Sequence, residues 1–213
     1  HSTFSLKYLY SLINSGNFNE AYNFSRKLEK ENKKSFESDL VIGIYYFKNS
    51  NFETSKKYFA SAINRKSRSM LDSYMASTLF LWSNLNSKRP EVSISNLDKL
   101  DDRFENLKRI QNVFLNCFYK NSNTEILFKD LLIDQKTDFS RYNYFYAKYL
   151  SSIGKIEKAK KIIKDSLTKY PRNLLLNQYL VDLENSKNSF NFSCESEKDV
   201  VAELMYIAAN ALS

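Results

Sequence analysis

Glycine and proline are so scarce in this chain that they decide its fold class. Only three glycines and two prolines occur among 213 residues. An all-β chain of this length needs many tight turns, and these two residues are among those that most often form them. Nearly every connection must therefore be a short turn between helices. The scarcity predicts an all-α protein.

Apolar residues recur with the spacing of amphipathic helices, and these helices come in pairs. The first four stripes cover residues 4–13, 18–28, 40–47 and 52–63. Gly16 separates the first pair, and Asn49–Asn51 separates the second. Phe18 and Phe52 open the second helix of successive pairs and so mark one repeat period. A fixed period in the thirties with two helices per unit is typical of a helical solenoid.

The clearest pair lies later in the chain, from Ser140 to Asn173. Gly154 forms its turn, and Pro171 ends its second helix because the residue before a proline avoids the α region. Less regular pairs are expected over residues 70–139, with Pro90 opening one helix. The further helices expected are Met70–Leu85, Pro90–Leu100, Phe104–Tyr119, Thr124–Ile133 and Leu174–Glu184. About 12 helices are predicted in all.

Small residues recur at fixed places in these pairs. In the clearest pair they are Ala147, Gly154, Ala159 and Ser166, followed by Pro171. The first two pairs match through Gly16, Phe18, Ala21 and Leu28, and through Gly43, Phe52, Ser55, Phe59 and Ala62. Small side chains let two helices approach closely at their crossing. Gly43 costs about 1 kcal/mol relative to alanine in a helix interior, which indicates a close contact there.

This pattern resembles the tetratricopeptide repeat (TPR). The resemblance implies a right-handed α-solenoid of antiparallel helix pairs, with the first helix of each pair lining a concave face. It implies a single domain over residues 1–213, with clear repeats at about 2–35, 36–69 and 140–173 and partial repeats over 174–213. The order of regular and irregular repeats is similar to multi-repeat TPR proteins of α-proteobacteria, which often carry an export signal. A bacterial protein is expected, and the compartment, periplasm or cytoplasm, is left open.

Residue scarcity also argues against most catalytic chemistry. No histidine follows His1, so Ser-His-Asp and Cys-His nucleophiles and histidine-based metal sites are excluded. The isolated glycines rule out a Walker loop and a dinucleotide fingerprint. We therefore predict no enzyme, no catalytic residue, no cofactor and no metal site. No apolar run is long enough to predict a transmembrane helix.

The TPR resemblance implies a peptide or partner protein bound on the concave face, by a scaffold that is not catalytic. The positions that match are Leu6, Tyr10, Ile13, Leu40, Ile44, Phe47, Lys48, Arg141, Tyr144 and Lys148. The apolar members between Leu6 and Phe47 would form one exposed patch rimmed by charge, which favours a binding site. The alternative is that a further N-terminal helix covers this patch.

RNA binding is the second hypothesis. The chain carries a formal charge of +8, and the segment from His1 to Met70 holds twelve Lys and Arg against six Asp and Glu. Such a surface attracts polyanions. Pentatricopeptide proteins, which are also helical hairpins, read bases with polar first-helix side chains. The largely apolar first helices here disfavour that interpretation, and nucleic acid is not the partner that we predict.

The C-terminal residues Ala202–Leu212 read as the first helix of another repeat. Such a helix without its partner leaves an apolar face uncovered, so we expect either a longer natural chain or a dimer through this helix. Cys117 lies on an apolar stripe and is expected to be a buried thiol. Cys194 lies in a polar connection. A disulfide between the two is neither inferred nor excluded.

Overall fold

The computed structural model describes residues 2–65, 69–134, 136–185 and 192–211. Within these ranges it contains twelve α-helices, one short 3₁₀ helix and no strand. The all-α prediction is confirmed. The helices are α1 (Ser2–Asn14), α2 (Phe18–Lys30), α3 (Phe36–Lys48), α4 (Phe52–Asn64), α5 (Met70–Ser83), α6 (Pro90–Asp98), η1 (Asp102–Phe104), α7 (Glu105–Phe118), α8 (Thr124–Leu132), α9 (Tyr142–Ser152), α10 (Ile156–Lys169), α11 (Leu174–Glu184) and α12 (Glu197–Ala211).

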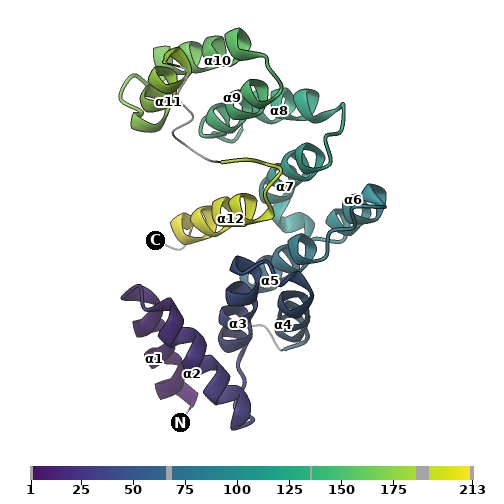
Figure 1. The fold of residues 1–213 in the computed structure, drawn as a ribbon, viewed down its shortest axis with the longest axis vertical. Coiled ribbons are helices and arrows are strands. Elements are labelled where there is room, and N and C mark those ends of the chain that lie inside the picture. The colour runs from purple at the N-terminus through teal and green to yellow at the C-terminus, as the bar shows by residue number, and fades with distance from the viewer. Residues whose placement is uncertain (1, 66–68, 135, 186–191, 212–213) are drawn as a thin grey trace. The chain divides into compact units, whose positions relative to one another are not determined.

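The chain divides into two compact units, His1–Asp102 and Arg103–Ser213. Unit 1 holds α1 to α6, and unit 2 holds α7 to α12. Within each unit successive helices lie against one another in pairs, such as α3 with α4 and α9 with α10 (Figure 1). This is the helical-repeat arrangement that the sequence predicts. One continuous solenoid over residues 1–213 stays a prediction.

The turns inside the pairs share one backbone geometry. Gly16 and Gly154 have φ of 76° and 79°, and Ser50 and Lys120 have φ of 60° and 55°. The N–H of each of these four residues donates to the carbonyl of the residue three positions earlier. The N–H of the following residue donates to the carbonyl five positions before itself. These are Schellman motifs, in which a left-handed residue ends a helix. The step from Gly16 to Ser50 equals the step from Lys120 to Gly154 and the step from Phe18 to Phe52, which confirms the repeat period.

Gly43 lies where two helices of one pair cross. A Cβ atom at this position would lie 2.5 Å from Cε1 of Phe59 on α4. The Ser55 hydroxyl, also on α4, donates to the Gly43 carbonyl at 2.8 Å. The predicted close contact is confirmed. In the pair formed by α9 and α10, Ala147 and Ile163 stand at the matching places and are fully buried.

Aromatic and aliphatic side chains fill both units. In unit 1 a cluster of Leu9, Leu12, Ala21 and Val41 joins α1, α2 and α3. In unit 2 the Phe114 ring on α7 contacts Phe128 on α8 and Phe145 on α9, with ring centroids 6.4 and 5.5 Å apart. In the described part of the chain, no helix is both long and apolar enough to cross a membrane.

Candidate functional site

The predicted first-helix surface of unit 1 is partly open. Tyr10 and Ile13 are 47% and 38% exposed. Leu6, Leu40 and Ile44 are half-buried, and Lys48 is exposed.

Phe47 does not belong to this open surface. It is 3% exposed, and its ring lies 5.1 Å from Phe52 and 6.4 Å from Phe59, both on α4. The expectation that it lies in an exposed patch is therefore wrong. Phe47 sits in the last turn of α3, where its side chain packs against the second helix of its own pair.

A groove of about 830 Å³ lies at the ends of the helices of unit 1. It is formed by the N-terminal half of α1, the last turns of α2, the first turn of α3 and the end of α4. Its apolar lining consists of Phe4, Leu6, Leu9, Phe24, Leu28 and Phe36. Its charged lining consists of Lys27, Lys33, Lys34 and Arg65, with Glu31 and Glu37. We call the apolar lining the floor of the groove and the charged lining its rim; the rim holds more cations than anions.

Sequence reasoning places only Leu6 of these lining residues at a binding position. The others lie on the N-terminal half of α1, at the ends of α2, α3 and α4, and in the turn between α2 and α3. One available signal is the lysine cluster over residues 27–34, which follows the apolar stripe of α2.

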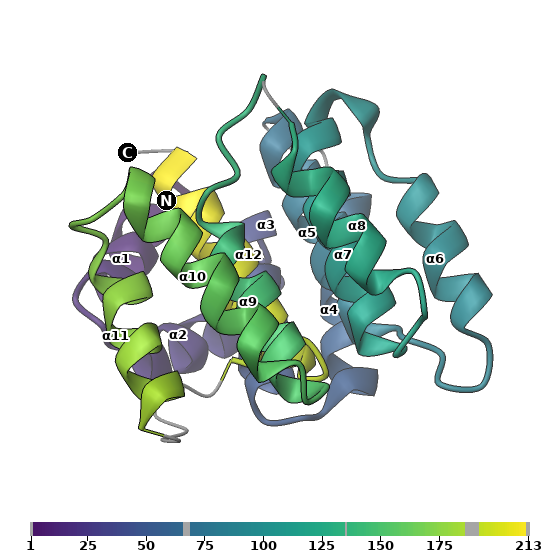
Figure 2. The same cartoon turned by 90° about the horizontal axis from the view of Figure 1, so that it is seen from above.

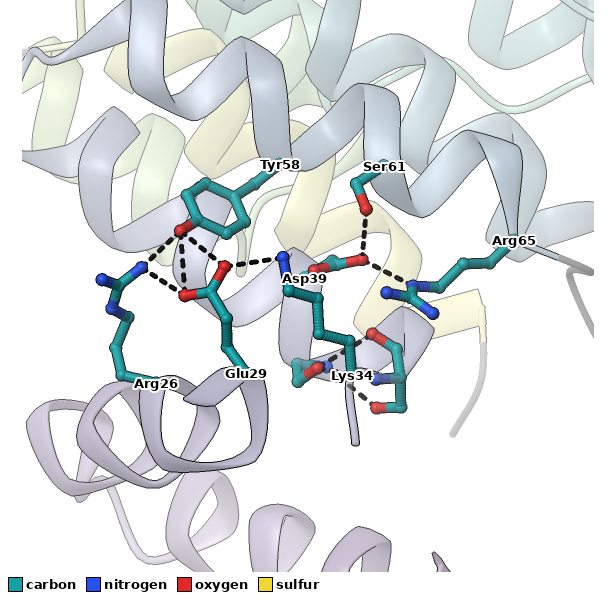
Figure 3. Close-up of polar contacts among 9 residues, drawn as sticks. Arg26, Glu29, Lys34, Asp39, Tyr58, Ser61 and Arg65 are labelled. Carbon is teal, nitrogen blue, oxygen red and sulfur yellow. Dashed lines mark hydrogen bonds and ion pairs between the residues drawn. The ribbon is translucent and has the colours of Figure 1, made fainter. Parts of the chain in front are cut away.

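Lys34 on the groove rim is held by a network on α2 and α4 (Figure 3). Its ammonium lies 2.6 Å from the Glu29 carboxylate, which also contacts Arg26 and accepts a hydrogen bond from Tyr58 at 3.1 Å. Burial alone would raise the pKa of Glu29, but hydrogen bonds from Lys34 and Tyr58 lower it below its ordinary value. Burial, then the bond to Glu29, raises the pKa of Tyr58 to about 12. At neutral pH the carboxylate is ionised and the phenol is protonated, so these bonds persist.

Arg65 on the same rim is held by a buried carboxylate. Its Nε donates to Asp39 at 2.6 Å, and the Ser61 hydroxyl donates to the same oxygen at 2.7 Å (Figure 3). Asp39 is fully buried in the first turn of α3, and a buried carboxylate needs such partners. The two networks fix Lys34 and Arg65 at the groove before any partner binds.

The predicted first-helix residues of unit 2 are engaged within the unit. Tyr144 is 3% exposed, with its ring 5.2 Å from the Tyr179 ring on α11. Lys148 lies over the same Tyr179 ring at 5.0 Å, and burial lowers the pKa of Lys148. Arg141 pairs with Glu203 on α12, and this hydrogen bond raises the pKa of Arg141. An open concave surface at these three positions is not what the structure shows.

The C-terminal segment, Phe192–Ala211, covers the part of this face formed by Arg141 and Phe145. The described residues that lead into α12 lie beside α7, and α12 lies behind α9 in the view from above (Figures 1 and 2). Cys194 forms a disulfide with Cys117 on α7. Val200, Val201, Leu204 and Ala208 are buried. One stripe of this helix is therefore covered, whereas Met205 and Tyr206 remain 39% and 50% exposed. The expectation of an uncovered apolar face on Ala202–Leu212 holds only in part, and a dimer through this helix stays a prediction. Leu212 itself lies outside the described residues.

In the described ranges, no cluster of three or more His, Cys, Asp or Glu residues has a geometry that could hold a metal ion. The polar groups described above are joined to one another in ion pairs and hydrogen bonds.

Comparison with known proteins supports the fold alone. No protein-family model matches the sequence, and no curated protein matches it significantly. A solved structure does match: a thermophilic TPR protein of Thermus thermophilus, with a TM-score of 0.56 and 16% sequence identity. The match covers 87% of this chain and 100% of that chain. The chain has a TPR-like fold. At this identity the match says nothing about partners.

Proposed function

We propose that this protein is a protein-interaction scaffold without catalytic activity, and that unit 1 binds a segment of a partner protein. The single observation that carries the proposal is the groove of unit 1, with its apolar floor and cationic rim. Apolar surface of this kind marks interaction sites, and charge around it selects the partner.

The occupant that fits is a peptide segment with apolar side chains and nearby carboxylates. Lys27 and Lys33 are exposed at the rim, while Lys34 and Arg65 are held in place by Glu29 and Asp39. Beyond the groove, Tyr10, Ile13, Leu40 and Ile44 are the further contacts that we expect along α1 and α3. The TPR-like fold supports this use of the first helices. The finer likeness to α-proteobacterial TPR proteins stays a prediction.

A displayed peptide library tests the proposal with the full chain as bait. We expect the enriched peptides to combine apolar residues with Asp or Glu, and Tyr10→Glu and Leu6→Glu to weaken their binding by at least tenfold. The far-ultraviolet spectrum and thermal melt should stay those of the unchanged chain. Enrichment of no peptide, or binding that survives both substitutions, would overturn the proposal.

A matched pair of charge reversals isolates the groove. Lys27→Glu places a carboxylate on the rim, whereas Lys57→Glu makes the same charge change at an exposed position of α4 outside it. We expect only Lys27→Glu to weaken the selected peptides. Equal weakening by both would indicate general charge attraction. Retention on single-stranded RNA that persists at about 0.2 M salt, without peptide binding, would favour the RNA hypothesis instead.

A further inference from the structure

The C-terminal segment places an aromatic side chain between two first helices of unit 2. The Phe192 ring lies 5.5 Å from the Phe114 ring on α7 and 4.5 Å from the Phe145 ring on α9. Phe114 and Phe145 are both buried. This is the side of the helix pairs on which the TPR resemblance predicts an external ligand. The segment therefore occupies a ligand position with side chains of the same chain.

Further along the segment, α12 presents a carboxylate to the same surface. Both nitrogens of a guanidinium fork on Arg141 donate to Glu203, each at 2.7 Å, and Glu203 is only 6% exposed. The Arg141 guanidinium also lies 4.0 Å from the centroid of the Tyr206 ring. Glu203 and Tyr206 are three residues apart and share one face of the helix. The surface thus recognises a carboxylate and an aromatic ring one helical turn apart, through a bidentate pair of defined geometry.

A disulfide holds this internal ligand in place. Cys117 on α7 and Cys194 are 77 residues apart in sequence and are joined with a Cα–Cα distance of 5.8 Å. Lys120 adds an exposed ion pair with Glu195 at 2.8 Å. A covalent tie next to the binding surface keeps the segment at a high effective concentration. While the bond is intact, this favours the chain's own segment over an external helix.

We propose that the surface formed by Phe114, Arg141 and Phe145 is a binding site for an amphipathic helix of a partner protein, and that the disulfide keeps it filled by the C-terminal segment. The partner helix carries a carboxylate and, three residues later, an aromatic ring. Reduction by a dithiol opens the site: two electrons and two protons pass to the sulfur pair, Cys117 and Cys194 become thiols, and the dithiol becomes a disulfide. This site shares no residue with the groove of unit 1, so either proposal can fail without the other.

A labelled synthetic peptide with the sequence of residues 192–211, carrying serine in place of Cys194, is the probe. It is titrated into the oxidised full chain and into a full chain with Cys194→Ser and Glu203→Gln, which weaken the hold of its own segment. We expect no binding to the oxidised chain and saturable binding to the variant. A peptide that also carries Glu203→Gln should bind the variant at least tenfold more weakly. Equal binding to both chains, or none to a variant with native helical content, overturns the proposal.

The role of the guanidinium is checked by a matched pair and a charge swap. Adding Arg141→Gln to the variant should lower peptide affinity at least tenfold, whereas Arg172→Gln, at an exposed position of the same unit, should not. Arg141→Glu should recover affinity for a peptide with Glu203→Arg. Equal losses at Arg141 and Arg172 would contradict specific recognition.

Hydrogen exchange tests the same proposal on the unchanged chain, so the result does not depend on whether a variant folds. Upon reduction with dithiothreitol, the amides of α12 should lose more protection than those of α9 and α10. Protection of α12 that is the same before and after reduction would overturn the role of the disulfide.

Discussion

Units 1 and 2 are built from the same helix pair but use its first helices differently. Each unit contains Schellman turns one repeat period apart and buries small residues at the helix crossings. In unit 1, Tyr10 and Ile13 on the first helix are exposed and a groove lies beside it. In unit 2 part of the matching side is covered by the C-terminal segment, with Glu203 paired to Arg141.

The difference shows what a repeat pattern determines. The pattern sets the helix pairs, because small residues and left-handed turns are needed wherever two helices cross closely. It does not set what lies on the first helices, since that depends on residues far away in the chain. An external partner is the occupant that we propose for unit 1, and the chain supplies its own for unit 2.

The largest expected effect tests where the open surface of unit 1 ends. Phe47→Ala should lower the free energy of unfolding by about 3–5 kcal/mol, because it removes a buried ring and leaves a cavity beside Phe52 and Phe59. Tyr10→Ala, at a half-exposed position of the same surface, should cost less than about 1 kcal/mol. Chemical denaturation followed by far-ultraviolet circular dichroism gives both values. If Phe47→Ala lowered the free energy of unfolding only slightly but weakened peptide binding, Phe47 would belong to the binding surface and not to the core.

The disulfide should stabilise unit 2 and leave unit 1 unchanged. Cys117→Ser removes the tie that closes a loop across 77 residues and should cost unit 2 about 2–4 kcal/mol, chiefly by freeing its unfolded state. Native-state hydrogen exchange measures the opening free energy of each unit, and we expect the two to differ after this substitution. Equal loss of protection in α3 and α9 would contradict this and would indicate that the units unfold together.

Substitutions at the helix crossing of unit 1 test whether its packing follows the same steric constraint as the crossing at Ala147 in unit 2. Gly43→Ala should destabilise the chain by about 1–3 kcal/mol, because the new Cβ would lie 2.5 Å from the Phe59 ring and overpack the crossing. That outweighs a gain of about 1 kcal/mol in helix propensity. Adding Phe59→Ile should recover stability, since alanine and isoleucine already occupy these positions in unit 2. A double-mutant cycle measures the coupling, and additive losses would contradict the shared constraint.

Local chemistry explains which features could be predicted from the sequence. The helix pairs, the turns at Gly16 and Gly154, the start of α6 at Pro90 and the contact at Gly43 each follow from neighbouring residues. Small or turn-forming residues allow few alternatives at such positions.

Features that join distant residues could not be predicted. Nothing local to Cys117 or Cys194 indicates that they pair, and the return of α12 to α9 depends on Glu203 and Arg141, 62 residues apart. An apolar residue such as Phe47 follows the same helical spacing whether it faces a partner or its own second helix. The groove of unit 1 could not be predicted because its residues come from four different helices and one turn.

The smallest expected effect concerns the carboxylates that join successive second helices in both units. In unit 1, Glu29 on α2 accepts a hydrogen bond from Tyr58 on α4. In unit 2, Glu125 on α8 contacts Lys155, at 2.7 Å, and Lys158, which lies on α10. Hydrogen bonds from Lys155 and then Lys158 lower the pKa of Glu125 from 4.5 to about 2.

For Glu125 the sign of the pH dependence is fixed by the lowered pKa. The folded state binds the proton less readily than the unfolded state, so the ionised carboxylate stabilises the fold above about pH 4.5, and this contribution is lost as pH falls toward about 2. Glu125→Gln should therefore be less stable than the unchanged chain at pH 7 by no more than about 1 kcal/mol, since its lysines are partly exposed. In urea unfolding series, the difference in free energy of unfolding between Glu125→Gln and the unchanged chain should shrink steadily between pH 4.5 and pH 2. The matched substitution in unit 1, Glu29→Gln, should cost more at pH 7, because Glu29 also accepts a hydrogen bond from Tyr58 and its cationic partners, Lys34 and Arg26, are less exposed than the lysines around Glu125. A difference for Glu125→Gln that grows on acidification would mean that the lysines do not hold this carboxylate in the folded chain.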